Sequence, residues 1–283
     1  MSTIKDLENI ASQVRRDIIR QVHYASSGHP GGSLGCADLL VALYFEIMDH
    51  NPDFNMDAKG EDLFFLSNGH ISPVLYSTLA RAGYFPVEEL ASFRKLNSRL
   101  QGHPATHEGL PGVRVATGSL GQGLSVSVGV ALSKKINKDN KLVFCLTGDG
   151  ELQEGQIWEA AMFAAHKKVD NLITIVDWNG RQIDGDTEDV MDLGDLKAKW
   201  QSFGWSVLEM EGNQMKSVVD TLKEAVDNAH QGKPQVILMR TEMGYPIDFM
   251  VGTHKWHGVA PNEEQTEQAL SQLEETLGDY PYN

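Results

Sequence analysis

Two polar residues follow hydrophobic runs that are typical of buried parallel strands. Asp149 stands between two glycines after the run LVFCLT, and Asn179 follows the run LITIVD, 30 positions later. The carboxyl ends of adjacent parallel strands meet at one edge of an open α/β sheet, where such sheets bind ligands, so we expect both side chains there. A carboxylate, an amide oxygen and a backbone carbonyl suit Mg²⁺ when a diphosphate and water complete its coordination. The pattern therefore predicts a magnesium-diphosphate site.

The residues around Asp149 distinguish a ligand site from a simple turn. Gly148 and Gly150 have no side chains, so the backbone N–H groups that lead into the next helix can face phosphate oxygens. Asp, Asn and Gly are also ordinary turn residues, and an isolated Gly-Asp-Gly would be read as a turn. The strand–helix–strand context, the spacing to Asn179 and the position of Glu154 just inside the crossover helix favour the ligand site.

Four histidines stand beside a glycine in turn-like segments, namely His29, His70, His103 and His257. Any one of them alone is more often a surface or structural residue. As a group they are suited to proton transfer near neutral pH, because imidazole has an unperturbed pKa in that range. The other histidines match no catalytic pattern, although the last of them is close to His257 in sequence: His23, His50, His107, His166, His230 and His254.

The elements that must position these residues alternate between strands and helices. The clearest unit is a strand, a helix and a strand over 142–177, which implies parallel neighbours and a right-handed crossover. The hydrophobic runs predict strands at 62–67, 142–147, 171–177, 206–210 and 234–240. The spacing of apolar residues predicts helices at 6–26, 36–48, 73–82, 155–168 and 215–230, and a solvent-facing helix at 263–277. The predicted fold class is α/β, a parallel sheet with helices on both faces.

Two further segments have glycine-rich sequences. Residues 118–135 predict a helix whose first turn contains Gly118, Ser119 and Leu120, and its small residues allow close approach of a ligand or another backbone. This is not a dinucleotide fingerprint, because no convincing strand precedes it. Residues 92–117 show no lasting periodicity and are predicted to form a functional loop.

Composition limits the function classes. A net charge of −15 argues against a nucleic-acid partner, which would need clustered Lys and Arg. Cys36 and Cys145 lie in apolar patterns without metal-site spacing, which predicts buried, reduced thiols and a cytoplasmic setting. No apolar run approaches the length of a membrane span, and the first ten residues lack the apolar core of a signal peptide. We therefore expect a soluble, unprocessed chain that has no membrane partner and forms one domain over residues 1–283 with a helical C-terminal tail.

Several segments together resemble the transketolase family. GDGELQEGQIWEA followed by NLITIVDWNGRQIDG is similar to the thiamine-diphosphate signature of that family. Further segments are similar to family motifs in the same order, namely GHPGGSLG, LSNGH, GHP followed by LPGV, TGSLGQGLSVSVGVA and WHG. The resemblance covers about residues 26–261 and implies the diphosphate-binding domain of a thiamine-diphosphate enzyme.

The resemblance also implies roles for individual residues. Asp149, Asn179 and the backbone carbonyl of Arg181 would bind Mg²⁺, for which Ca²⁺ or Mn²⁺ could substitute. Many relatives have an aliphatic residue at position 181, so the side chain of Arg181 is unexplained. His29 and His257 would transfer protons at the hydroxyl next to the breaking bond, and His103 would hold the terminal hydroxyl of the donor. Contacts to thiamine diphosphate would come from His70, Gly118, Ser119, Leu120, Gly150, Glu154, Asn179 and His257, with Glu154 also supporting a subunit contact.

By the same resemblance, this chain would be one half of an enzyme. Single-chain transketolases continue with a pyrimidine-binding domain and a C-terminal domain, and the glutamate that helps to activate the cofactor lies in that part. We therefore expect a C-terminal partner chain, with two chains of each kind in a heterotetramer. The expected reaction transfers a two-carbon ketol unit from a ketose, such as a sugar phosphate, to an aldose. Pentose phosphates, branched sugars and sulfo-sugars all remain open as substrates.

Other readings also fit parts of the sequence. The nearest are the α chain of a 2-oxo-acid dehydrogenase, a subunit like deoxyxylulose-phosphate synthase, and a non-catalytic assembly subunit. His29, His103 and His257 favour sugar substrates over decarboxylation. The presence of both Asp149 and Asn179 argues against a degenerate assembly subunit.

Overall fold

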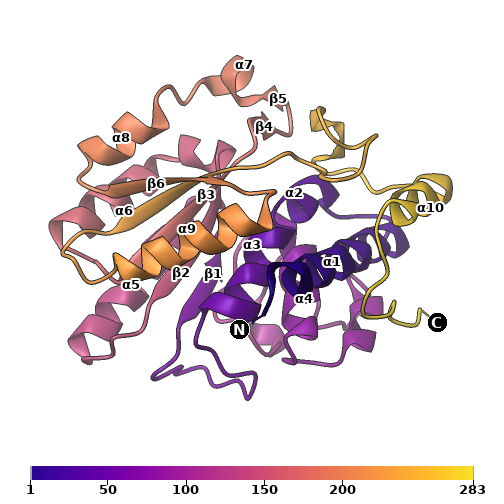
Figure 1. Cartoon of the computed structure of the whole chain (residues 1–283), viewed down its shortest axis with the longest axis horizontal. Helices are drawn as coiled ribbons and strands as arrows, with labels where there is room; N and C mark the ends of the chain where they lie inside the picture. The colour runs from indigo at the N-terminus through magenta and orange to yellow at the C-terminus, as the bar shows by residue number, and fades with distance from the viewer. Residues whose placement is uncertain (1, 283) are drawn as a thin grey trace.

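The computed structural model describes residues 2–282, which build a five-stranded parallel sheet with helices on both faces (Figure 1). The strands lie in the order β1 (Leu63–Leu66), β2 (Val143–Gly148), β3 (Leu172–Trp178), β7 (Gln235–Arg240) and β6 (Ser206–Glu211). A short antiparallel hairpin follows β3 and consists of β4 (Arg181–Gln182) and β5 (Gly185–Asp186). The predicted α/β fold class and all five predicted strands of the sheet are confirmed.

The two faces of the sheet bury two separate hydrophobic clusters. Successive side chains of β2 alternate between them, so that Phe144 and Leu146 enter one cluster while Val143 and Cys145 enter the other. The first cluster is covered by α1 (Ile4–Tyr24), α2 (Pro30–Gly35), α3 (Ala37–Ala42), α4 (Ser72–Arg81) and α9 (Met215–Asp227). The second is covered by α5 (Gln122–Ile136), α6 (Gly155–His166) and α8 (Leu196–Ser202). Burial on both faces explains why the strands appear as nearly continuous apolar runs.

Some local predictions were wrong. Residues 30–35 were not expected to be helical, yet they form α2, with Pro30 in the first turn, where its missing N–H costs nothing. The predicted helix at 36–48 is α3 followed by a π-helical turn at Leu43–Ile47. Short α7 (Thr187–Met191) and α8 were not predicted, since neither is long enough to show a helical period. The remaining single turns are Gly69–Ile71, Val87–Ser92, Thr106–Glu108, Gly150–Gln153 and His254–Trp256.

The C-terminal helix is shorter than predicted and is not simply exposed to solvent. α10 (Glu263–Ser271) ends at Ser271 because Arg16 of α1 takes the carbonyls of Leu270 and Leu273, with its Nη1 at 2.9 and 2.8 Å. The chain then turns back along α1, where Asp279 pairs with Arg16 at 2.7 Å and Tyr280 is buried. In Figure 1 this last segment, in yellow, lies beside the indigo α1. Among residues 2–282, no helix has both the length and the apolar character that a membrane span requires.

Strand register brings the carboxyl ends of the central strands to one level. Gly148 of β2 pairs with Asp177 of β3, and Asp177 pairs in turn with Met239 of β7. The residues that follow these positions therefore leave the sheet side by side. This is the edge at which the sequence predicted a ligand site.

Candidate active site

A cavity of about 300 Å³ opens at the carboxyl ends of β2 and β3. Nine of the residues predicted for the site line it: His29, His70, Leu120, Asp149, Gly150, Glu154, Asn179, Arg181 and His257. Gly118, Ser119 and His103 do not line it, but the ring centroid of His103 lies 4.6 Å from that of His70. The fold thus brings segments from the whole length of the chain around one cavity.

The floor of the cavity is formed by Asp149 and the turn that contains Asn179. The Asp149 carboxylate accepts a hydrogen bond from Gly180 N at 2.7 Å with Oδ2 and one from Gly150 N at 2.8 Å with Oδ1. Asn179 Oδ1 accepts from Arg181 N at 2.9 Å. The adjacent strand ends therefore place the carboxylate, the amide and the Arg181 backbone in one small region, as the spacing predicted.

The electrostatics of this floor suit a cation. Asp149 is 1% exposed and Asp177 is 2% exposed, and neither forms an ion pair with any side chain within residues 2–282. Burial, followed by the nearby Asp177 carboxylate, raises the pKa of Asp149 to about 7. Two buried carboxylates without a positive partner are costly, and a divalent cation would offset that cost.

The available donors also fit Mg²⁺. Asp149 offers carboxylate oxygens, Asn179 an amide oxygen and Arg181 a backbone carbonyl, all of which are hard ligands. In the described part of the chain, no three His, Cys, Asp or Glu side chains cluster as a metal site. A site that takes one carboxylate from the protein and oxygens from a bound diphosphate needs no such cluster. The residues present therefore fit a Mg²⁺-diphosphate group.

A glycine turn borders the cavity before α5. Gly118 has a φ of +122°, and a Cβ there would lie 2.6 Å from Cδ2 of His103. Only glycine allows this backbone conformation and this contact together. Ser119 is exposed, and Leu120 places its side chain at the cavity wall. The turn thus keeps His103 beside the cavity.

The four predicted histidines form one cluster on the wall opposite Asp149. The ring centroid of His29 lies 5.0 Å from that of His70 and 5.6 Å from that of His257. His29 precedes Pro30 at the start of α2, and His257 follows the turn His254–Trp256. Within the described residues, the Nδ1 atoms of His29 and His257 are buried and have no hydrogen-bond partner. A bound hydroxyl group could supply one.

The environment keeps these imidazoles neutral. Burial is the main cause for all four, and it lowers the pKa of His29 to about 3, with further contributions from the neighbouring histidines and Arg94. The pKa values of His70, His103 and His257 are lowered as well. Neutral imidazole can accept a proton, so the cluster is suited to act as a base at neutral pH.

Several residues of the site were missed in the sequence. Glu151 is buried and accepts hydrogen bonds from Gly121 N at 2.8 Å and Gly148 N at 3.1 Å. Ile183 lies between β4 and β5, lines the cavity and is 60% exposed. An isolated Ile in the polar stretch DWNGRQIDGD was a signal that could have indicated it. The other missed lining residues are Gly32, Asn68, Ile71, Gln153, Asp177, Gln182 and Met243.

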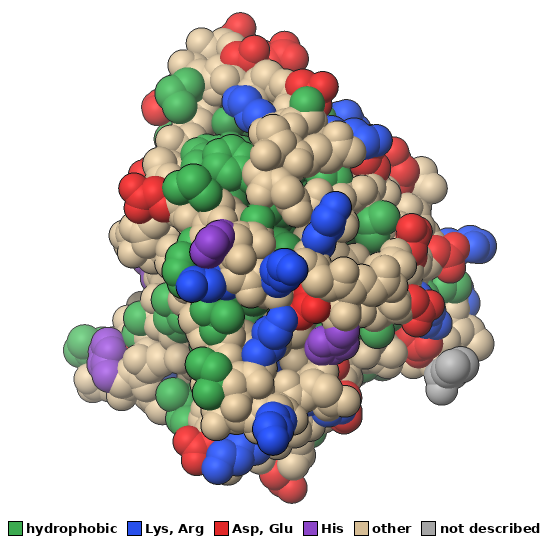
Figure 2. Space-filling model, turned by 90° about the vertical axis from the view of Figure 1, so that its left-hand side faces the viewer, with side chains coloured by type: hydrophobic (Ala, Val, Ile, Leu, Met, Phe, Trp, Pro, Cys, Tyr) green, Lys and Arg blue, Asp and Glu red, His purple; other side chains and the backbone are tan. Residues whose placement is uncertain are grey.

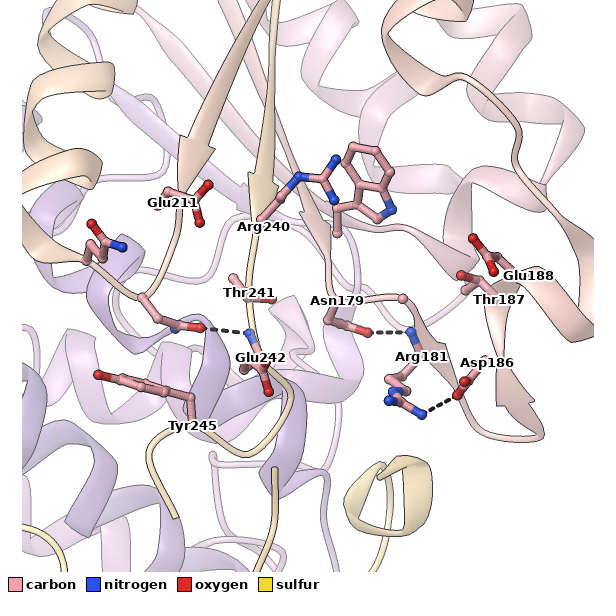
Figure 3. Close-up of a pocket in the computed structure, with 14 residues that line it drawn as sticks. Asn179, Arg181, Asp186, Thr187, Glu188, Glu211, Arg240, Thr241, Glu242 and Tyr245 are labelled. Carbon is pink, nitrogen blue, oxygen red and sulfur yellow. Dashed lines mark hydrogen bonds and ion pairs between the residues drawn. The ribbon is translucent and has the colours of Figure 1, made fainter. Parts of the chain in front are cut away.

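A second cavity, of about 700 Å³, lies beside the first and shares Asn179 and Arg181 with it (Figure 3). Its walls come from the ends of β3, β6 and β7. The Arg181 side chain points to Asp186 and forms an ion pair across the β4–β5 hairpin. Arg240 lies over the ring of Trp178, with Cζ 3.9 Å from the ring centroid. The role of the Arg181 side chain is therefore to join the two strands of the hairpin.

The side of the molecule that carries α5, α6 and α8 shows hydrophobic side chains among lysines, arginines and carboxylates (Figure 2). Met162 and Phe163 of α6 are 61% and 46% exposed. Glu154, whose backbone caps the start of the same helix, is exposed as well. Exposed apolar side chains of this kind often mark protein contacts, but the predicted subunit contact of Glu154 stays a prediction.

Comparison with known proteins gives a consistent result. Residues 7–281 match the family model described as transketolase, thiamine diphosphate binding domain. The chain is 39% identical to one named subunit of the apulose-4-phosphate transketolase of Phocaeicola vulgatus, over 97% of this chain and 96% of that protein. It is 38% identical to a 6-deoxy-6-sulfo-D-fructose transketolase subunit of Clostridium sp. strain MSTE9, over 95% of this chain and 96% of that one.

Solved structures agree with these relatives. The transketolase of Campylobacter jejuni superimposes with a TM-score of 0.88 at 34% identity, over 96% of this chain and 43% of that chain. The transketolase of Leishmania mexicana gives the same TM-score at 30% identity, over 100% of this chain and 43% of that one. The chain thus spans less than half the length of these solved proteins, but nearly the whole length of the Phocaeicola and Clostridium subunits.

Proposed function

Because the chain belongs to the transketolase family, we propose that it is the thiamine-diphosphate-binding subunit of a transketolase built from two kinds of chain. The support comes from the relatives of similar length, which are named as subunits. The pyrimidine-binding half would come from a partner chain, and the assembly would be a heterotetramer with two chains of each kind. This proposal fits the exposed apolar residues on α6, which begins at Glu154.

The single observation that carries the proposed chemistry is the arrangement of two unlike walls around one cavity. On one wall, Asp149 is buried without a cation beside Asn179. On the other, His29, His70 and His257 are neutral and close together. The first wall is suited to hold a metal-bound diphosphate, and the second to move protons at sugar hydroxyls.

In this proposal Asp149, Asn179 and the Arg181 carbonyl hold Mg²⁺, and Gly150 N faces the diphosphate. Thiamine diphosphate, when bound, supplies the nucleophilic carbon that the protein itself lacks. His29 and His257 accept and return the proton of the hydroxyl beside the breaking bond, because their Nδ1 atoms have no other partner in the described chain. His103 and His70 hold the donor next to the cofactor, and Leu120 and Ile183 exclude water from the cavity.

The reaction we propose is transfer of a two-carbon unit from a ketose to an aldose. The relatives are named for apulose 4-phosphate and for 6-deoxy-6-sulfo-D-fructose, which both carry an anionic group. We therefore propose a donor ketose with a phosphate or sulfonate at the end remote from the carbonyl. The histidine cluster has no counterpart requirement in simple decarboxylation, which makes a 2-oxo-acid dehydrogenase subunit the weaker alternative.

Reconstitution tests this proposal. The purified chain should have no transketolase activity alone and should gain it when a partner chain with the pyrimidine-binding domain is added. In the reconstituted enzyme, Asp149→Ala should abolish Mg²⁺-dependent binding of thiamine diphosphate. Asp53→Ala, which changes an exposed carboxylate remote from the cavity, should leave binding unchanged and is the matched control. Activity of the single chain, or unchanged cofactor binding by Asp149→Ala, would contradict the proposal.

A further inference from the structure

Asp177 is a buried carboxylate beside the metal-binding turn. It lies in β3, two residues before Asn179, and is 2% exposed. Its carboxylate accepts hydrogen bonds from Asn179 Nδ2 at 2.8 Å, from Thr241 Oγ1 and from the Cys36 thiol. No Lys, Arg or His side chain of residues 2–282 forms an ion pair with it. Neither the cavity lining nor the proposed ligand set explains why a charge is buried here.

The contact with Asn179 decides which way its amide faces. Asn179 Nδ2 donates to Asp177 while Oδ1 accepts from Arg181 N at 2.9 Å. A flipped amide would place Oδ1 against the Asp177 carboxylate and Nδ2 against the Arg181 N–H group, and both contacts would be repulsive. A carboxylate only accepts hydrogen bonds, whereas a hydroxyl or amide could also donate. Asp177 therefore fixes the amide oxygen on the side of the Arg181 backbone, where the metal site is proposed.

The charge of Asp177 matters as well. Gly148, which precedes Asp149, pairs with Asp177 in the register of β2 and β3, and Asp149 N donates to Asp177 O at 3.1 Å. The two carboxylates thus lie on neighbouring strands, and both are buried without a cation. Together they bring two negative charges to a water-poor region, which matches the charge of one divalent cation.

We propose that Asp177 is a positioning residue for the metal, which orients the Asn179 amide oxygen and adds the second buried negative charge beside Asp149. This inference rests on the proposed function, since it assumes the metal at Asp149 and Asn179. The competing explanation is structural: Asp177 could simply join β3 to the end of β7 through Thr241. The two explanations differ in what they predict for the metal-free protein. A buried charge kept for a metal destabilises the metal-free fold, whereas a structural contact stabilises it.

The test uses the full 283-residue chain and the near-isosteric variant Asp177→Asn. Mg²⁺ is titrated calorimetrically at a fixed, high concentration of thiamine diphosphate, and thermal melting is recorded without metal. We expect Asp177→Asn to weaken Mg²⁺ binding by about 10- to 100-fold, as for other residues that orient a metal ligand. We expect its metal-free melting temperature to equal or exceed that of the unsubstituted chain. Asp170→Asn is the matched control, because Asp170 precedes the other end of β3 and pairs with Lys135. It should lower stability and leave the Mg²⁺ affinity unchanged.

Each outcome decides the proposal. Equal Mg²⁺ affinity of Asp177→Asn and the unsubstituted chain would overturn the role of Asp177 alone. A lower metal-free melting temperature with equal Mg²⁺ affinity would establish the structural explanation. If the unsubstituted chain binds no Mg²⁺ with thiamine diphosphate, the proposed function and this inference both fail. If Asp177→Asn does not fold, Thr241→Val decides, because it loosens the carboxylate without changing the charge. It should weaken Mg²⁺ binding by about threefold to tenfold, and an unchanged affinity would overturn the proposal.

Discussion

Glu151 accepts a hydrogen bond from the backbone N–H of Gly121 at 2.8 Å, and this contact joins the turn after β2 to the glycine turn before α5. The same carboxylate accepts from Ser67 Oγ, at the end of β1, and from Gly148 N. One buried side chain thus connects three loops around the cavity. The relative positions of Asp149 and of the turn at Gly118 depend on it.

Glu151→Gln should destabilise the protein. The substitution keeps the shape of the side chain, but it replaces one acceptor oxygen with an N–H₂ group that must face the N–H of Gly148 or Gly121. Leaving one buried donor without an acceptor costs about 1–3 kcal/mol. Urea unfolding of the variant measures the loss. Glu159→Gln, on the exposed surface of α6, is the control and should change stability by less than about 0.5 kcal/mol. Equal stability of the two variants would show that the buried contacts contribute nothing.

Gly118→Ala should move His103 and destabilise the fold. The added Cβ would lie 2.6 Å from His103 Cδ2, and the φ of +122° is strained for any residue with a side chain. A cost of about 1–3 kcal/mol is expected. Gly129→Ala is a matched control within α5, where a new Cβ meets no atom within 4 Å. That change should stabilise the helix by about 0.5–1 kcal/mol. Thermal or urea unfolding should therefore give opposite signs for the two variants, and equal signs would refute this account of the turn.

Acid should destabilise the chain through its histidine cluster. The pKa of His29 is lowered from 6.5 to about 3 by burial, so the unfolded state binds a proton below pH 6.5 and the folded state does not. The stability that neutral His29 provides is therefore complete above pH 6.5 and is lost progressively as the pH falls towards 3. The loss is at most about 1.4 kcal/mol per pH unit for one histidine.

Unfolding in urea between about pH 8 and about pH 4.5 measures this effect across the range in which the unfolded histidine titrates. His29→Gln removes the titrating group, so its stability should fall less steeply below pH 6.5 than that of the unsubstituted chain. The comparison at the alkaline end, where His29 is neutral in both states, gives the cost of the substitution itself. Parallel stability curves for the two proteins across the whole range would contradict the lowered pKa of His29.

Much of the site could be predicted from the sequence because strand ends are local features. Asp149 and Asn179 follow apolar runs, and parallel pairing of β2 and β3 then places them together. Glu151 and Asp177 were missed for the opposite reason. Their partners, such as Ser67 and Thr241, come from distant segments, and no local pattern shows which buried carboxylate will meet which hydroxyl.

Prediction of the fold was limited in the same way. The end of α10 at Ser271 is set by Arg16, far away in sequence, which takes the last carbonyls of the helix. The run of apolar residues up to Leu277 gave no sign of this competition. The β4–β5 hairpin and α7 were missed because their few residues are polar, and their conformation depends on contacts such as that between Arg181 and Asp186.

Arg181→Ala should affect the metal site only weakly. The proposed ligand is the backbone carbonyl, which the substitution keeps, and the Arg181 N–H still donates to Asn179 Oδ1. The side chain pairs with Asp186 across the hairpin, and both groups are partly exposed to solvent. An ion pair of this kind contributes about 0–1 kcal/mol, so Mg²⁺ affinity at a fixed concentration of thiamine diphosphate should fall by less than about fivefold. Asp186→Ala removes the same ion pair from the other side and should have an equal effect, measured by the same calorimetric titration. A loss of more than about a hundredfold in Arg181→Ala alone would mean that the guanidinium itself contacts the bound diphosphate.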